Sequence, residues 1–241
     1  MKNLILSVLA IFSFYTSQAQ WGKDKKINGN GNMTTITRTT SSYEGISCAG
    51  SFDYILVSGT EGNITIEGEE NLLEYIITEV KDNNLIIKTE NNIYLSCSRN
   101  KTIKITIPFK DIDEVALAGS GDLWNEDKIT STNFKVALAG SGDVILNIEA
   151  STTKASIAGS GDLTLKGNTN TLEANVSGSG DFHGFDLQSK FTDVSVAGSG
   201  DAEVVSIESL KARVSGSGDI EYKGQPKTKD TKVAGSGSIS N

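Results

Sequence analysis

Apolar and polar residues alternate along most of this chain, most regularly over residues 115–241. The Gly-Ser-Gly segments there have apolar residues two and four positions before the first glycine and four positions after it, with Thr231 as the one polar exception. The three sets are Leu117, Leu138, Ile157, Val176, Val196, Val214 and Val233; Val115, Val136, Ala155, Ala174, Val194, Ala212 and Thr231; and Leu123, Val144, Leu163, Phe182, Ala202, Ile220 and Ile239. A period of two predicts β-strands with one buried face.

Between the two predicted strands of each repeat stands the sequence Gly-Ser-Gly-Asp. In the last repeat this sequence is Gly-Ser-Gly-Ser. Its first glycines are 21, 19, 19, 20, 18 and 19 residues apart. A period of about 20 residues in a β-rich sequence indicates a solenoid, in which each coil buries its apolar face only against its neighbours. We therefore predict an all-β solenoid over residues 115–241, with one Gly-Ser-Gly-Asp corner in each coil.

These corners suit a structural role. Glycine adopts positive φ without steric cost, and Asp accepts hydrogen bonds from nearby backbone N–H groups. The small residue before each first glycine is expected to let adjacent coils pack closely. The predicted structural corners are Gly119 with Asp122, Gly140 with Asp143, Gly159 with Asp162, Gly178 with Asp181, Gly198 with Asp201, and Gly216 with Asp219.

The six aspartates would form a column with a spacing of about 4.8 Å, at which neighbouring charges repel by about 1 kcal/mol in water. Backbone N–H groups or calcium ions could offset this repulsion. We favour the backbone, because calcium-binding β-helices place acids in every nine-residue turn. No corner serine has a histidine partner, since His183 is the only histidine. We therefore expect no catalytic, cofactor-binding or metal-binding residues, with calcium at the column as the alternative.

Residues 33–114 lack the corner but also alternate. "TTITRTT", "FDYILVSG", "NITIEGEE", "IITEVKD", "NLIIKTE" and "TIKITIP" predict strands. We expect a helical turn at 70–75 and a hairpin turn at 81–84. Cys48-Ala49-Gly50-Ser51 resembles the later corners, so this β-rich portion is predicted to run directly into the coils, with 33–241 as one continuous unit.

The N-terminus predicts export. Lys2 precedes an apolar run of about a dozen residues and a small-residue cleavage site, so residues 1–19 read as a signal peptide that ends at Ala19. A flexible lead-in is expected over residues 20–32. No cysteine follows the cleavage point, and no later segment has 18 consecutive apolar residues. We expect no lipid anchor and no stable membrane insertion, and a location in the periplasm or on the outer surface of a Gram-negative bacterium.

The net charge and the two cysteines bear on nucleic-acid binding and on disulfide formation. The formal net charge of −8 argues against nucleic acid, which requires clustered Lys and Arg. Cys48 and Cys97 would meet an oxidising environment after export, which favours a disulfide; two buried, unpaired thiols are the alternative.

The last corner lacks Asp and little chain follows it, so an exposed strand edge leaves homo-oligomerisation open. The charges and proline of residues 223–230 would discourage open-ended stacking.

The chain resembles the "putative auto-transporter adhesin, head GIN domain" family of exported Bacteroidota proteins. The resemblance rests on residues 50–89, on "IKITIPFKDIDEVALAGSGDL" at 103–123, and on the run of corners, and covers about residues 44–237. It implies a right-handed, single-stranded parallel β-helix with a β-rich N-terminal portion. It also implies export and an adhesin-like role, and it supplies no catalytic residues.

Three functions follow from these observations. The first is a non-enzymatic adhesin-like protein whose solenoid binds a glycan or protein ligand. Its aromatic candidates are Trp124, Phe182, Phe185, Phe191 and Tyr222, although we expect most of them to stack inside the coil instead. The second is a periplasmic structural module with a protein partner. The third is a polysaccharide-acting enzyme, which we disfavour because the aspartates are equivalent and acid and base roles need different environments.

Overall fold

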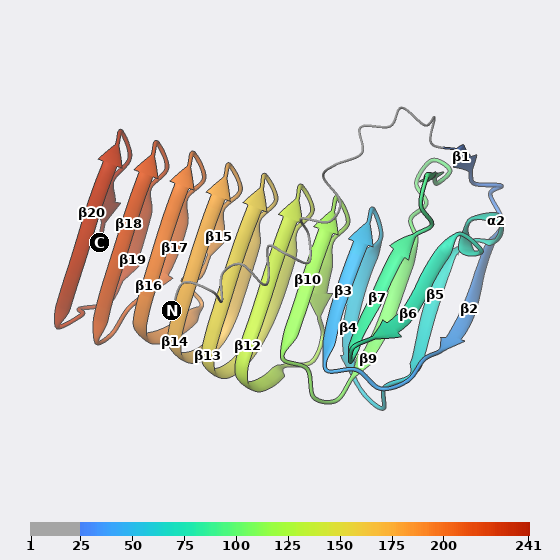
Figure 1. The fold of residues 1–241 in the computed structure, drawn as a ribbon, viewed down its shortest axis with the longest axis horizontal. Helices are drawn as coiled ribbons and strands as arrows, with labels where there is room; N and C mark the ends of the chain where they lie inside the picture. The colour runs from blue at the N-terminus through green and yellow to red at the C-terminus, as the bar shows by residue number, and fades with distance from the viewer. Residues whose placement is uncertain (1–24) are drawn as a thin grey trace.

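The computed structural model describes residues 25–241, which form an elongated β-solenoid of about 7 turns (Figure 1). The N-terminal elements are β1 (Lys25–Asn28), β2 (Met33–Thr39), β3 (Gly45–Gly50), β4 (Asp53–Ser58), β5 (Asn63–Glu69), α2 (Glu70–Leu73), β6 (Ile76–Lys81), β7 (Asn84–Thr89), β8 (Ile93–Ser96) and β9 (Lys104–Phe109). The later strands are β10 (Glu114–Gly119), β11 (Leu123–Asn125), β12 (Ile129–Gly140), β13 (Val144–Gly159), β14 (Leu163–Gly178), β15 (Phe182–His183), β16 (Leu187–Gly198), β17 (Ala202–Val205), β18 (Ser209–Gly216), β19 (Ile220–Lys223), β20 (Thr228–Gly235) and β21 (Ile239–Ser240).

Successive coils pair in parallel and in one register. Gly119 lies opposite Gly140, Gly140 opposite Gly159, and the first glycines stay aligned to Gly235. Unequal repeat lengths are absorbed on the other side of the coil, where β13 and β14 run unbroken but the next coil is split into β15 and β16. The predicted solenoid with a corner at each Gly-Ser-Gly is confirmed.

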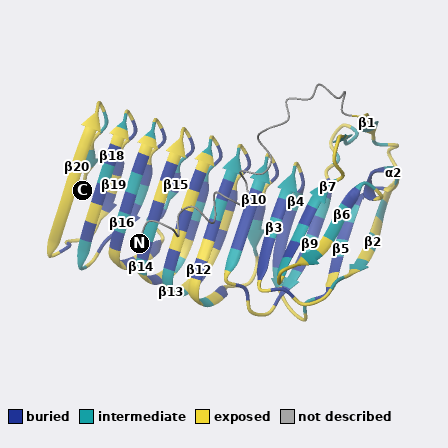
Figure 2. Ribbon diagram, in the orientation of Figure 1, coloured by how far each residue is buried: buried dark blue, intermediate teal, exposed yellow. Residues whose placement is uncertain are grey.

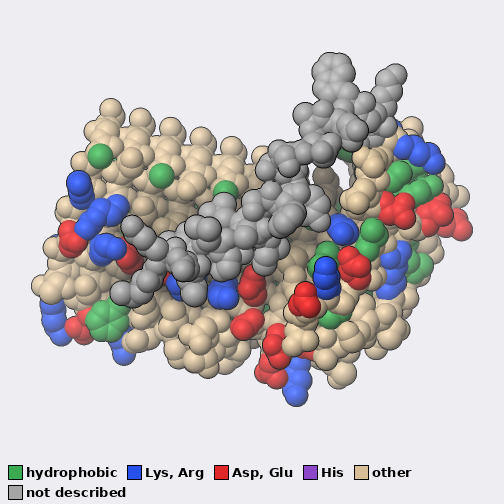
Figure 3. Space-filling model, in the orientation of Figure 1, with side chains coloured by type: hydrophobic (Ala, Val, Ile, Leu, Met, Phe, Trp, Pro, Cys, Tyr) green, Lys and Arg blue, Asp and Glu red, His purple; other side chains and the backbone are tan. Residues whose placement is uncertain are grey.

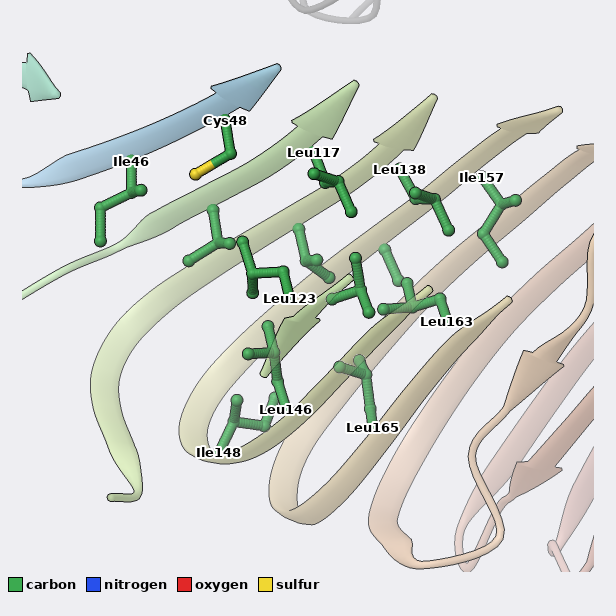
Figure 4. Close-up of a cluster of buried hydrophobic side chains, with 14 of the residues drawn as sticks. Ile46, Cys48, Leu117, Leu123, Leu138, Leu146, Ile148, Ile157, Leu163 and Leu165 are labelled. Carbon is green, nitrogen blue, oxygen red and sulfur yellow. The ribbon is translucent and has the colours of Figure 1, made fainter. Parts of the chain in front are cut away.

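Apolar side chains fill the interior of the coils in layers (Figure 4). Leu117, Leu138 and Ile157 form a row from consecutive strands, and each is at most 2% exposed. Leu123 and Leu163, from strands that follow the corners, lie within the same interior. Burial of one such side chain contributes about 1.5–3 kcal/mol, and each coil depends on its neighbours for that burial.

The first coil begins before residue 115. β3 and β4 form a coil whose corner is Gly50-Ser51-Phe52-Asp53, and Gly50 pairs with Gly119. Gly50 has a φ of 124°, close to the 131° of Gly119. The faint resemblance of residues 48–51 to the later corners therefore reflects a true coil, with Phe52 in place of the second glycine.

Chain order and stacking order differ at the N-terminal end. β7 pairs in parallel with β3, and β9 pairs in parallel with β4, so later strands lie outside earlier ones. β2, β5 and β6 add antiparallel pairs at this end (Figure 1). The expected helical turn is α2. The expected hairpin turn joins β6 to β7, with Asp82 and Asn83 at φ values of 51° and 59°.

The expected flexible lead-in is wrong for residues 25–28, which form β1. This strand pairs in parallel with β8, with Lys25 opposite Ile93. Backbone hydrogen bonds to the segment 92–96 order residues that are polar and lack an apolar alternation of their own. The predicted signal peptide, residues 1–19, and the first residues of the lead-in lie outside the described residues.

A buried carboxylate holds the β1–β8 pair. Glu69 is 1% exposed and accepts hydrogen bonds from the N–H of Gly31 at 2.6 Å and from the N–H and hydroxyl of Ser98 at 2.7 and 2.6 Å. Burial acts to raise the pKa of Glu69, but these hydrogen bonds and the charge of Lys101 outweigh it and lower the pKa. The ionised form of Glu69 therefore stabilises the folded state.

The last coil is built differently from the others. β20 is exposed along its whole length (Figure 2). Lys229 and Thr231 take the register positions of the buried residues Leu210 and Ala212. The Lys229 ammonium donates to the Tyr222 hydroxyl at 2.9 Å. An inward-facing charge on an edge strand opposes pairing with another chain, so the last coil acts as a cap.

Candidate binding groove and aspartate column

Contacts between coils explain the corner glycines. The Gly140 carbonyl accepts N–H bonds from Ser160 at 2.8 Å and from Gly161 at 3.1 Å. A Cβ on Gly161 would lie 2.0 Å from the carbonyl oxygen of Gly142, and a Cβ on Gly159 would lie 2.2 Å from that of Gly140. Gly159 also has a φ of 138°, which strains other residues. The same close contact recurs at Gly119, Gly140, Gly178, Gly198 and Gly216.

The corner aspartates form a hydrogen-bonded column. The Oδ1 atom of Asp162 accepts the N–H of Asp181 at 2.9 Å. Equivalent bonds of 2.6–3.2 Å join each aspartate to the next coil. The column consists of Asp122, Asp143, Asp162, Asp181, Asp201 and Asp219, and it ends at Ser238. These charge-assisted bonds offset part of the repulsion of about 1 kcal/mol expected between neighbouring carboxylates.

The small residues before the corners point outwards, onto the surface of the solenoid. Ala158, Ser177 and Ala197 are exposed. Side chains alternate along a strand, so an inward Val176 places Ser177 on the outer face. The corner glycines are positions of close backbone approach between coils.

Paired charges line the outer strands. Lys154 lies 2.8 Å from Glu173, and Lys211 lies 2.6 Å from Asp193. Figure 3 shows basic and acidic side chains interleaved on the visible face. Exposed pairs of this kind contribute little to stability.

A polar groove crosses the coils at the bend away from the corners. Two adjoining open hollows of about 670 and 430 Å³ share Glu149 and Ala150. Exposed residues in register form the two rims, and less exposed residues form the floor between them. One rim is Thr130, Glu149, Asn168 and Gln188; the other is Thr132, Ser151, Asn170 and Lys190; the floor is Ser131, Ala150, Thr169 and Ser189.

Charge changes along this groove. One end carries four carboxylates, and the other end carries a lysine beside an exposed isoleucine. The acidic set is Glu44, Asp111, Asp113 and Glu149; the other end has Lys190 and Ile207. Lys128 lies 3.3 Å from Glu149 and neutralises part of that end. The middle of the groove presents hydroxyl and amide groups together with Glu149, which lines both hollows.

The aromatic candidates do not form a strip. Phe182 and Tyr222 are buried, Trp124 and Phe185 are half-buried, and Phe191 is 45% exposed. The Phe185 ring is covered by the Lys223 ammonium at 3.7 Å.

The predicted disulfide is not formed, and both cysteines are free thiols. Cys48 is 2% exposed in β3, between Ile87 and Leu117 of the neighbouring strands. Cys97 follows β8, which is not a partner of β3. Burial raises the pKa of both thiols.

Sequence reasoning missed the groove. Its signal is a break in alternation at the same point of each coil, where two consecutive residues face outwards or nearly so. These pairs are Thr132-Asn133, Ser151-Thr152, Asn170-Thr171 and Lys190-Phe191. The residues that line the groove differ from coil to coil, so no motif marks it.

Comparisons with known proteins agree on family and fold. The sequence profile described as "Putative auto-transporter adhesin, head GIN domain" matches residues 42–226. No curated protein matches the chain. Across residues 25–241 the structure contains no helix of the length and apolar character that a membrane span requires.

Three crystal structures share the architecture. A "putative adhesin" from Bacteroides fragilis is 24% identical, with a TM-score of 0.81 over 89% of this chain and 99% of that one. A "Putative lipid binding protein" from Parabacteroides distasonis is 29% identical, with a TM-score of 0.74 over 90% and 99%. A "putative adhesin" from Parabacteroides merdae is 20% identical, with a TM-score of 0.70 over 90% and 98%.

Proposed function

We propose that this chain, which belongs to the "Putative auto-transporter adhesin, head GIN domain" family, is an exported, non-enzymatic adhesin-like protein that binds an extended neutral glycan. The polar groove is the proposed binding surface. The single observation that carries the proposal is the alignment of hydrogen-bonding side chains across four coils of one rigid solenoid.

The spacing of the groove favours a polymer. Neighbouring strands lie about 4.8 Å apart, close to the length of one pyranose unit, so each coil can present one hydrogen-bonding group per sugar. Asn168 and Gln188 are adjacent in register and supply both donors and acceptors. The carboxylates at one end would repel uronate or sialate groups, which selects neutral sugars.

The test uses a matched pair of variants on β14. Asn168→Ala removes an exposed amide from the groove, and Asn175→Ala removes an exposed amide from the outer strand face. We expect Asn168→Ala with Gln188→Ala to weaken binding to a neutral glycan on an array by about tenfold, or about 1.4 kcal/mol. Asn175→Ala should bind like the wild type.

Two results would contradict the glycan proposal. One is absence of binding to any neutral glycan on the array. The other is an equal loss of binding in the groove variants and in Asn175→Ala, which would mean that the groove is not the glycan-binding surface.

Export is part of the proposal and has its own test. The apolar N-terminal run supports it, and N-terminal sequencing of the native protein should begin at Gln20. Protease treatment of intact cells should degrade a surface adhesin before the outer membrane is opened. Survival until the membrane is opened would favour the second candidate, a periplasmic module with a protein partner.

The non-enzymatic assignment rests on the uniformity of the aspartate column. Every carboxylate in it makes the same backbone bond to the next coil, whereas acid and base roles need two carboxylates that are held in different ways. Release of reducing ends from a bound polysaccharide would overturn this assignment.

A further inference from the structure

One side chain breaks the regularity beside the aspartate column. The residue two positions after each corner aspartate faces outwards. After Asp143, Asp162, Asp181 and Asp201, these residues are Ile145, Thr164, His183 and Glu203. These positions are in register. His183 thus places an imidazole beside two carboxylates of the column, Asp162 and Asp181.

The three side chains converge. One ligand atom of Asp162, one of Asp181 and one ring nitrogen of His183 all lie within 4.8 Å of one another. A zinc ion holds each oxygen or nitrogen at about 2 Å, so two ligand atoms on one ion lie about 3–4 Å apart. These partly exposed side chains reach that separation by small rotations.

The column fixes both carboxylates in advance. Oδ1 of Asp162 accepts the N–H of Asp181 at 2.9 Å, and Oδ1 of Asp181 accepts the N–H of Asp201 at 2.7 Å. Among the described residues, the second oxygen of each carboxylate has no hydrogen-bond donor. Each aspartate therefore offers one free oxygen from a backbone-anchored position.

A third carboxylate orients the imidazole. Nδ1 of His183 lies 3.3 Å from Oε2 of Glu203 on the following coil. When Nδ1–H donates to that carboxylate, Nε2 is the unprotonated nitrogen and is free to bind a metal. Glu203 is a positioning residue in this arrangement.

We infer that Asp162, Asp181 and His183 form a binding site for one late first-row divalent cation, represented by Zn²⁺. Imidazole suits zinc and its neighbours, whereas calcium prefers an all-oxygen shell of six to eight ligands. The site therefore differs from the calcium column considered from the sequence. The other full corners have the aspartates without the imidazole.

The test is Zn²⁺ titration of the full chain, followed by calorimetry and by the NMR signals of the imidazole. There is only one histidine, so these signals belong to His183. We expect one Zn²⁺ per chain, a shift of the imidazole signals, and no such shift with Ca²⁺.

Three variants separate this site from general attraction to an acidic column. His183→Thr installs the residue found one coil earlier, and it should weaken Zn²⁺ by at least about tenfold. Asp181→Asn should do the same, because its amide oxygen keeps the bond from Asp201 but is a poor zinc ligand. Asp122→Asn lies two coils before Asp162 and bonds to neither proposed aspartate ligand, so it should leave the affinity unchanged.

Several results would overturn the inference. They are imidazole signals that do not move with Zn²⁺, equal affinity in His183→Thr and wild type, or an equal loss in Asp122→Asn. Thermal melts of each variant show whether it is folded. The Asn168→Ala variant should still bind Zn²⁺, so this test is independent of the glycan proposal.

Discussion

Substitution of Gly161 by Ala tests whether coil contact explains the corners. Gly161 does not have a positive φ, so the effect comes from the added Cβ alone. That Cβ would lie 2.0 Å from the carbonyl oxygen of Gly142, whereas ordinary contact begins at 3.4 Å. The two coils must therefore separate by more than about 1 Å at this point.

Three hydrogen bonds span the gap that this substitution opens. They are Ser160 N–H and Gly161 N–H to the Gly140 carbonyl, at 2.8 and 3.1 Å, and Asp162 N–H to Asp143 Oδ1 at 3.1 Å. At about 1 kcal/mol each, their loss predicts destabilisation by about 3 kcal/mol.

Urea unfolding followed by circular dichroism measures this difference. Ser160→Ala is the matched control, because the Ser160 side chain is exposed and its change should shift the free energy of unfolding by less than about 0.5 kcal/mol. If Gly161→Ala is as stable as Ser160→Ala, the second glycine is not required by coil contact and the structural account of the corners fails.

Three further predictions concern the ends of the molecule and its thiols. Lys229→Leu should turn the cap into an apolar edge and cause self-association, seen as a larger mass by light scattering. The Lys232 side chain points outwards, so Lys232→Leu should keep the mass of the wild type. Because the folded-state pKa of Glu69 is lowered from 4.5, its contribution to stability is complete above about pH 4.5 and is lost as the pH falls through the folded value; Glu69→Gln should flatten this acid dependence of the melting temperature. A maleimide should label Cys97 in the native protein and Cys48 only after unfolding without reductant, and failure to label either in urea would restore the disulfide.

The repeated corner made the coil predictable, because its spacing sets the register of every strand from Gly119 onwards. The stacking order before that point was not predictable. β7 and β9 lie outside β3 and β4, and such pairing depends on contacts between residues about 40 to 50 positions apart, which alternation does not encode. The groove was missed for a related reason: its residues share a position in the coil but not a residue type.

The cysteine pairing failed because sequence separation carries no information on strand neighbours. Cys48 looked like one half of a bridge, yet its strand is enclosed by β7 and β10. The convergence of His183 with two aspartates was equally hidden, since it requires knowing that consecutive corners lie in register.

The aspartate column has a direction. In every bond the acceptor oxygen belongs to the earlier coil and the N–H donor to the later one. A chain that emerges N-terminus first can therefore fold one coil at a time, because each finished coil already presents the acceptors that position its successor. Ser238, which has no carboxylate to offer, closes this sequence at the last corner. The column thus favours the addition of coils from the N-terminal end towards the C-terminal end, and it ends at Ser238.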